Sequence, residues 1–562
     1  MLFGTKYNNL FLVKSLIFSI FIFILGYFSI GFALLSPENG DEGYFLRIII
    51  ELVKGREFIK DFATNQPVFI MYLFYPLKFF TTNYFLSSRI LVGVFNFFIL
   101  YILYKCLFKN NKFFIPLYFF FFCIIFLFSN NILYYSFEIR QWPIIYLLQI
   151  LLAFFIFQYS NNFENKYIFI IGIILALLSS SRQTYLILFP IIFTTIFFYD
   201  FYNKKINKEA FKKYIYLILG FIIVFFVFLR VVFYDLNFAL GLWYLINQSN
   251  HFSDHNFSGK LSVINQLLYF FGYQKGASGI SIITFSSILL YLYLFFITFT
   301  KTNIFNLLIF IISTTMIFAT FYGWSHLYHK EVFYFVFVFF LLDNYRHKNR
   351  FFSILFILTF IILSYNYFIN SNDYYITKYN KNLKFFNNAY NSLINKNFHK
   401  IDFYTKLNRE LDLLCNDDIL TWDTRRGRLI SSNSKCNYHP KIVNEYMSVG
   451  IMHRGIYSQN ITDKIFEITL RPEELIFFIL YDVGLILAND FEDLINEINL
   501  IIKRNSLDKI INKKICKDEC LKSEDRQENL NHISIKIQNI ILENFNQMKK
   551  GDLTFFERKY LN

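Results

Sequence analysis

Long apolar runs are the feature of this sequence that most restricts its fold. Through the first two thirds of the 562 residues they recur at the length of about 20 residues that a helix needs to cross a bilayer. They predict a polytopic α-helical membrane protein. The first run has no small-residue cleavage site after it, so we expect it to stay as an anchor. The eleven expected spans are residues 16–35, 85–104, 113–129, 143–159, 167–181, 184–200, 214–234, 279–300, 304–321, 331–343 and 351–369.

Composition excludes some classes of protein. With 55% hydrophobic residues the chain is neither an ordinary soluble protein nor a disordered one. The 78 Phe and 41 Tyr, together with abundant Asn, Ile and Lys, are typical of an AT-rich genome, so aromatic density indicates no sugar or nucleic-acid surface. A net charge of +15 would suggest an anionic partner in a soluble protein. Here much of it lies in short loops, and we expect membrane lipids, not nucleic acid, around the chain.

The charges of these loops predict how the spans are oriented. Lys and Arg are concentrated in residues 105–112, 204–213 and 346–350, which share one side of the membrane if there are eleven spans. The positive-inside rule makes that side cytoplasmic. The predicted organisation is a membrane domain at residues 1–370 and an extracytoplasmic domain at 371–562, in a bacterial inner (plasma) membrane.

The C-terminal third is polar and is expected to form a small α/β domain. Residues 419–422 have the composition of a strand, and residues 490–503 have apolar residues at helical spacing. The apolar run at 475–487 is too short to span a membrane and is expected to be buried core. Four cysteines lie in this third, and outside the cytoplasm they could form one or two disulfides, with three full pairings open. They are Cys415, Cys436, Cys516 and Cys520.

Acidic residues follow the first expected span. Asp41 and Glu42 come directly after it, and Asp61 and Gln66-Pro67 follow in what we expect to be a polar, then amphipathic, loop at residues 36–84. Acids after a span are often only the solvated start of a loop. A functional role is also consistent with their chemistry, because a positioned carboxylate can act as the general base that takes the proton of an attacking hydroxyl.

Cationic residues at the same predicted side could bind an anion such as a phosphate. Arg140 lies in residues 137–143 just after Glu138, and Arg182 follows three serines between two spans. Guanidinium groups match phosphate oxygens with paired hydrogen bonds. Snorkelling to the interface is the structural alternative. A third group, just before residue 331, could contact phosphate, hold a divalent metal with Asp41 or Asp61, or belong to the interfacial belt. It consists of His326, His329 and Lys330.

Taken in order, these motifs resemble those of GT-C membrane glycosyltransferases that use polyprenyl-phosphate sugars. That group includes the protein O-mannosyltransferases and the lipid A aminoarabinose transferases, and the resemblance covers residues 10–370. The Gln66-Pro67-Val68 turn departs from the family's frequent Lys-Pro-Pro, so the lysine that touches the donor phosphate in some members is absent.

The resemblance implies an inverting glycosyltransferase that moves a sugar from a polyprenyl-phosphate donor to a glycolipid, polysaccharide or protein at the outer face. It implies that Asp41 is the catalytic base and Glu42 its helper or alternate. Asp61 would order the loop or acceptor, Gln66 would lie at the substrate, and the cations described above would contact the donor phosphate. No cofactor is implied beyond the lipid-linked donor, with a divalent metal left open.

Two other classes of protein share this membrane content. A polytopic transporter or flippase predicts charged or broken helices near the midplane and often paired repeats, and we see no repeat. An oligosaccharide ligase or polymerase depends mainly on a large external loop late in the chain. The acidic pair after the first span favours the glycosyltransferase.

Overall fold

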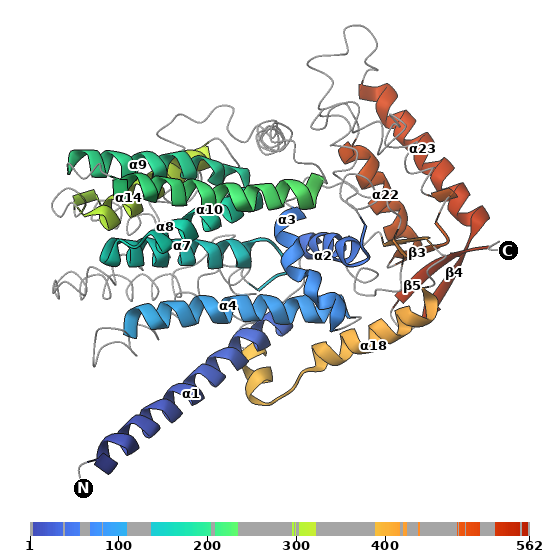
Figure 1. The fold of residues 1–562 in the computed structure, drawn as a ribbon. Helices are drawn as coiled ribbons and strands as arrows, with labels where there is room; N and C mark the ends of the chain where they lie inside the picture. The colour runs from blue at the N-terminus through green and yellow to red at the C-terminus, as the bar shows by residue number, and fades with distance from the viewer. Residues whose placement is uncertain are drawn as a thin grey trace, which may run out of the picture. The chain divides into compact units, whose positions relative to one another are not determined.

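The structure is a computed structural model of the chain, and two compact units are recognised in it (Figure 1). The first unit comprises Met1–Pro37 and Arg89–Phe398, and the second comprises Glu38–Ser88 and His399–Asn562. The predicted domain boundary at 370–371 lies outside the described residues and stays a prediction. The structure describes residues 4–36, 40–56, 68–80, 83–108, 137–203, 208–233, 295–296, 298, 303–321, 388–415, 420–423, 437–438, 480–481, 483–488, 490–505, 523–550 and 553–559.

Long apolar helices make up the described part of the first unit. Seven of the expected spans coincide with them, and the other four lie wholly or largely outside the described residues, so the count of eleven stays a prediction. The helices are α1 (Gly4–Leu35), α4 (Tyr84–Phe108), α7 (Trp142–Asn162), α8 (Asn165–Ser181), α9 (Leu188–Tyr202), α10 (Lys208–Phe233) and α14 (Ile304–Phe321). Among the residues that the structure describes, four stretches are long and apolar enough to cross a membrane: Tyr84–Ile102, Trp142–Asn162, Tyr185–Tyr202 and Lys208–Val232.

Short turns make neighbouring helices run back on each other. Pro143 lies in the first turn of α7, where its missing N–H is not needed, and α7 ends at Phe163 in the left-handed conformation with a φ of 55°. α8 begins two residues later. The 3-10 helix η2 (Gln183–Ile187) then joins α8 to α9. Helices α7, α8, α9, α10 and α14 lie side by side as a result (Figure 1).

Glycines allow two pairs of helices in this unit to approach closely. A Cβ atom on Gly172 of α8 would lie 2.3 Å from the carbonyl oxygen of Leu217, and one on Gly220 of α10 would lie 2.2 Å from that of Phe169. α1 and α4 approach in the same way, because a Cβ on Gly93 would lie 2.6 Å from the Cα of Ile30. Small residues at such contacts are the usual means by which helices pack in lipid.

Basic residues predicted in loops extend the ends of helices instead. α4 runs to Phe108 and so includes Lys105, and α10 begins at Lys208 and so includes Lys212 and Lys213. The Lys213 Nζ donates a hydrogen bond of 2.7 Å to the buried carboxylate of Asp200 on α9. Long aliphatic stems let lysine stay in a helix while its ammonium group reaches the interface or an acid, which the loop prediction did not take into account.

A short helical stretch at residues 388–394 packs against α1. The Tyr27 hydroxyl donates a hydrogen bond of 2.7 Å to the Leu393 carbonyl, and the Phe28 ring stacks on Tyr390 at 6.1 Å between centroids. A Cβ on Gly31 would lie 2.1 Å from the Leu393 side chain. The chain is therefore fixed to α1 a few residues before the second unit resumes at His399.

The expected loop at residues 36–84 is wrong in its first half, because α2 (Gly40–Val53) is a helix. Its apolar residues are buried, including Phe45, Leu46 and Ile49. They recur at helical periodicity, so the amphipathic pattern of this stretch belongs to a helix and not to a loop. α3 (Val68–Met71) and the 3-10 helix η1 (Tyr72–Phe79) follow.

The C-terminal part of the second unit is an α/β domain, as predicted. Its five-stranded sheet has the order β2-β1-β3-β5-β4. β1 pairs in parallel with β2 and β3, and β5 pairs antiparallel with β3 and β4. The elements are α18 (His399–Leu414), β1 (Leu420–Asp423), β2 (Asn437–Tyr438), β3 (Leu485–Ala488), α22 (Phe491–Asn505), α23 (Ser523–Asn544), β4 (Phe545–Lys550) and β5 (Leu553–Arg558).

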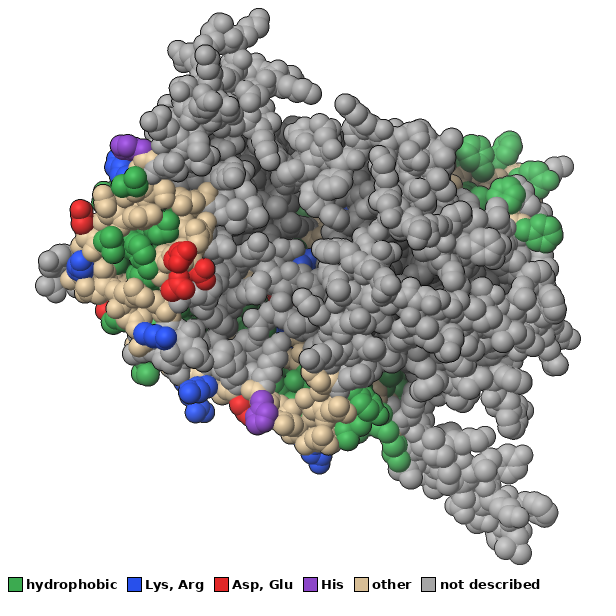
Figure 2. Space-filling view, turned by 180° about the vertical axis from the view of Figure 1, so that it is seen from behind, with side chains coloured by type: hydrophobic (Ala, Val, Ile, Leu, Met, Phe, Trp, Pro, Cys, Tyr) green, Lys and Arg blue, Asp and Glu red, His purple; other side chains and the backbone are tan. Residues whose placement is uncertain are grey.

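The core of this domain comes from the segments that the sequence indicated. β1 and α22 confirm the predicted strand and helix, and β3, at the end of the apolar run 475–487, is buried throughout. Described side chains of both charge signs are interspersed with small hydrophobic areas over the surface at the left of Figure 2. Cys415, at the end of α18, is in a disulfide. The other five cysteines lie outside the residues whose side chains the structure describes.

The glycine contacts generate a test of the membrane unit. We expect Gly172→Val to lower the unfolding free energy by about 1–3 kcal/mol, because the new side chain must displace the backbone of α10. The melting temperature of the purified protein in a fixed detergent measures this effect. Gly26→Ala is the matched control, because a Cβ there lies 3.7 Å from the nearest atom of Phe97, an ordinary contact. Equal melting temperatures for the two variants would contradict the close approach of α8 and α10.

Candidate functional site

Three segments of the first unit meet at one buried arginine. Arg89 has no exposed surface. Its Nη1 donates hydrogen bonds to the carbonyl oxygens of Ala33 at 2.7 Å, Ser36 at 3.2 Å and Phe137 at 3.3 Å. The last carbonyls of a helix have no partner within that helix and carry the negative end of its dipole, so a guanidinium is well suited to them. The end of α1, the start of α4 and residues 137–141 therefore lie together at one end of the bundle.

Residues 137–141 bring a buried ion pair to this end. Arg140 and Glu138 are 5% and 0% exposed, and the Arg140 Nε lies 2.7 Å from a Glu138 carboxylate oxygen. Two charges withdrawn from water are stable only if they are well paired. The ion pair therefore requires residues 137–141 to keep one conformation, in which the Glu138 carboxylate orients the Arg140 side chain.

A second arginine, Arg182, lies at the N-terminal end of α7. Arg182 separates α8 from η2, and its guanidinium carbon lies 5.2 Å from the centroid of the Trp142 ring, at the first residue of α7. Such stacking orients the guanidinium and stabilises it by cation–π attraction. Two turns farther along α7, the Gln149 side chain donates a hydrogen bond of 2.5 Å to the Tyr185 hydroxyl. Trp142 therefore stacks with Arg182 and follows Arg140 by two residues in the chain.

The three serines before Arg182 are turned toward their own helix. Ser179, Ser180 and Ser181 donate hydrogen bonds of 2.7, 2.9 and 2.6 Å to carbonyls of the preceding turn of α8. This is the local bonding that serine adopts in buried membrane helices. The serines stabilise the end of α8, and Arg182 is the side chain of this motif that could meet a ligand.

The predicted site residues have different outcomes. Arg182 stacks on Trp142, and Arg140, two residues before Trp142 in the chain, is paired with Glu138. Asp41 is the second residue of α2, its side chain lies outside the described ones, and Glu42 is 1% exposed. Asp61, Gln66, His326, His329 and Lys330 lie outside the described residues.

Sequence reasoning assigned no role to two groups of buried charges. Arg89 was given no function, although a lone arginine in the first turns of an apolar span is itself a signal. In α2, Glu51 pairs with Arg47 and, at 2.8 Å, with Arg56. The spacing of Arg47 and Glu51 by four residues within an apolar helix could have identified that pair.

A metal site is not formed by the side chains that the structure describes. Among them, no three His, Cys, Asp or Glu residues lie close enough together to hold an ion. The residues proposed from the sequence for a metal are outside that set.

Comparisons with known proteins give a distant likeness only. No family model and no curated protein matches the chain. Solved structures that match include the Archaeoglobus fulgidus oligosaccharyltransferase in the apo form, at 12% identity and a TM-score of 0.44, over 86% of this chain and 71% of that one.

The same protein also matches in two complexes. That with Zn and sulfate matches at 13% identity and a TM-score of 0.44, over 83% and 67% of the two chains. The archaeal oligosaccharyltransferase AglB from Archaeoglobus fulgidus, in complex with an inhibitory peptide and a dolichol-phosphate, matches at 11% identity and a TM-score of 0.43. This match covers 86% of this chain and 71% of that one. Likeness at this level identifies neither the family nor the activity of this chain.

The Glu138–Arg140 pair can be tested by a double-mutant cycle. We expect Arg140→Met to lower the unfolding free energy by about 3–5 kcal/mol, because the buried Glu138 carboxylate loses its ion-pair partner. Adding Glu138→Gln should restore most of that loss, since no buried charge then lacks its counterpart. Thermal unfolding in one detergent is measured for Arg140→Met, Glu138→Gln and the double variant. If the second substitution restores nothing, the two side chains are not energetically coupled.

Proposed function

We propose that this protein is an inverting membrane glycosyltransferase that moves one sugar from a polyprenyl-phosphate donor to a glycolipid, glycan or protein acceptor. The observation that carries the proposal is the stacking of Arg182 on Trp142, at the bundle end where Arg89 binds the last carbonyls of α1. A lipid-linked phosphate lies at the membrane surface, and helix ends are where a span reaches that surface.

Arg182 is the proposed ligand of the donor phosphate. It is half-buried, and stacking on Trp142 already orients its planar guanidinium, so little conformational freedom is lost when an anion binds. Arg140 is ion-paired with Glu138, so together they add no net charge, and its proposed role is to shape the site. Positive charge at the leaving phosphate stabilises the negative charge that develops there as the glycosidic bond breaks.

Asp41 is the proposed base, a role that rests on the sequence. It follows Ser36, whose carbonyl Arg89 binds, by five residues along the chain. Its carboxylate would take the proton of the acceptor hydroxyl while that oxygen bonds to the anomeric carbon. The phosphate leaves as a stable anion from the opposite face, so the product has inverted configuration. Glu42 is proposed as helper through its position in the same buried helix.

The distribution of charges favours this reading over a transporter. In α4, α7, α8, α9, α10 and α14, the described acidic and basic side chains lie near helix ends, with Arg89 and Arg182 at one end and Asp200 and Lys213 at the other. Transporters gather such groups near the midplane, often at broken helices.

The α/β domain is proposed to lie outside the cytoplasm. The disulfide of Cys415 supports this placement, because structural disulfides persist in oxidising compartments and are rare in the cytosol of mesophiles. The same side follows from the loop charges by the positive-inside rule. A bacterial plasma membrane is the proposed location.

Activity can be tested by mass analysis of envelope glycolipids from cells with and without the protein. We expect loss of a single-sugar mass difference in its absence. Asp41→Asn should lower the modification by about 100-fold or more at normal protein levels, because the base is lost. Asp402→Asn is the matched control, an exposed acid in the first turn of α18. Full activity of Asp41→Asn would remove Asp41 from the base role, and unchanged glycoconjugates in deleted cells would oppose the whole proposal.

The location of the α/β domain can be tested on intact cells or right-side-out vesicles. We expect a membrane-impermeant maleimide to leave Cys415 unlabelled until an impermeant reductant is added, and then to label it. Cys415→Ser identifies the labelled site. Labelling only after the membrane is permeabilised would place the domain in the cytoplasm.

A further inference from the structure

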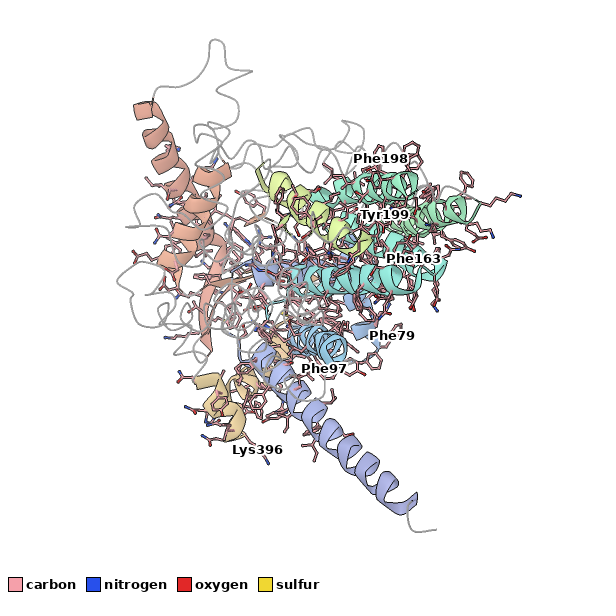
Figure 3. The ribbon with its side chains drawn as sticks, turned by 90° about the vertical axis from the view of Figure 1, so that its left-hand side faces the viewer. Phe79, Phe97, Phe163, Phe198, Tyr199 and Lys396 are labelled. Atoms are coloured by element: carbon pink, nitrogen blue, oxygen red, sulfur yellow. The ribbon has the colours of Figure 1, made fainter. Side chains whose placement is uncertain are left out.

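The segment just before α4 has one buried and one exposed apolar face. Val68, Ile70, Met71 and Phe74 of α3 and η1 are no more than 2% exposed. In contrast, Leu73 is 47% exposed, Phe79 73% and Phe80 80%. Figure 3 labels Phe79, whose ring projects from its segment. Two consecutive phenylalanines at this exposure, in a segment whose opposite face is buried, indicate a surface that meets something other than water.

Polar groups around this face have the composition of a membrane interface. The Nζ of the exposed Lys78 lies 5.5 Å from the centroid of the Tyr75 ring and 3.5 Å from its hydroxyl. Tyr75 in turn lies 6.5 Å from Phe79, ring to ring. Tyrosine and lysine beside apolar rings occur together where a protein meets lipid headgroups, because each has an apolar body and a polar tip.

Chain connectivity limits how far this face can be from the bilayer. Phe80 precedes Tyr84, the first residue of α4, by four residues, and α4 contains the apolar stretch Tyr84–Ile102. Four residues reach at most about 14 Å, less than half of the bilayer's hydrocarbon thickness of about 30 Å. α4 also begins sharply, because the Leu86 N–H donates to the Asn83 side chain at 3.2 Å. Phe79 and Phe80 are therefore tethered next to the plane at which α4 enters the membrane.

We propose that Leu73, Phe79 and Phe80, with Lys78, form a membrane-docking surface that inserts between the headgroups and acyl chains of the leaflet at the N-terminal end of α4. Lys78 contacts anionic headgroups, and the two phenylalanine rings lie among the upper acyl carbons. With α4 following it, this surface holds the segment that contains α3 and η1 against the bilayer. The inference concerns lipid contact and does not depend on the proposed glycosyl transfer.

Site-specific photocrosslinking in the full-length protein tests the surface. A benzophenone amino acid replaces Phe79 or Phe80 in vesicles of phosphatidylcholine and phosphatidylglycerol. We expect lipid adducts, detected by mass spectrometry, in several-fold greater yield than from Phe74, which is buried in the same segment, or Leu542, which is 58% exposed in the α/β domain. The Leu542 variant also serves as the control if replacement of Phe74 prevents folding.

Other products would overturn the proposal. Crosslinks from Phe79 and Phe80 to the protein's own chain, crosslinked dimers, or lipid adducts no more abundant than at Leu542 would each assign the face to another contact. Lys78→Glu tests the headgroup part. It should reduce the Phe80 adduct several-fold when phosphatidylglycerol is present and little in phosphatidylcholine alone. If Lys78→Glu changed the yield of the Phe80 adduct by the same factor in both kinds of vesicle, Lys78 would have no part in the headgroup contact.

Discussion

The described part of the membrane unit depends on how one buried cation is satisfied. A guanidinium without exposure at the end of a membrane span is costly unless fixed oxygens surround it. Arg89 obtains three carbonyls from two segments, the end of α1 and Phe137. These contacts align the first two helices of the unit with the segment that precedes α7. That alignment also limits where Arg140 and Trp142 lie in space, because both are within five residues of Phe137 in the chain.

Sterics determine the remaining helix contacts. Lipid tails are as apolar as the helices, so burial of apolar surface gives no driving force between spans, and close approach of backbones becomes decisive. The reciprocal contacts of Gly172 and Gly220 provide it for α8 and α10. Bulky side chains face outward instead, as with Phe198 and Phe163 at the margin of the bundle (Figure 3), which are 64% and 48% exposed. The abundant phenylalanine of this chain is thus in part a lipid-facing surface.

The two ends of the bundle use charge differently. At one end Asp200 takes up Lys213 and the Tyr214 hydroxyl between α9 and α10, which closes a hairpin. At the other end Glu138 takes up Arg140, while Arg182 stacks on an indole ring. Stacking fixes the orientation of the Arg182 guanidinium, whereas the Glu138 carboxylate neutralises the charge of Arg140. This difference is why Arg182 is the proposed phosphate ligand and Arg140 is proposed only to shape the site.

The sequence by itself determined the helix positions in the membrane unit and the α/β character of the C-terminal third, because both depend on local apolar periodicity and length. It also indicated Arg140 and Arg182, since arginines at the ends of apolar runs are conspicuous. It did not determine that residues 40–53 are helical, where buried pairs such as Arg47–Glu51 made the pattern look polar. Only the tertiary structure decided the partners of Arg89, the meeting of Arg182 with Trp142 and the contact of Leu393 with α1. Those contacts join residues 40 to 366 positions apart, and periodicity carries no information about which distant segments become neighbours.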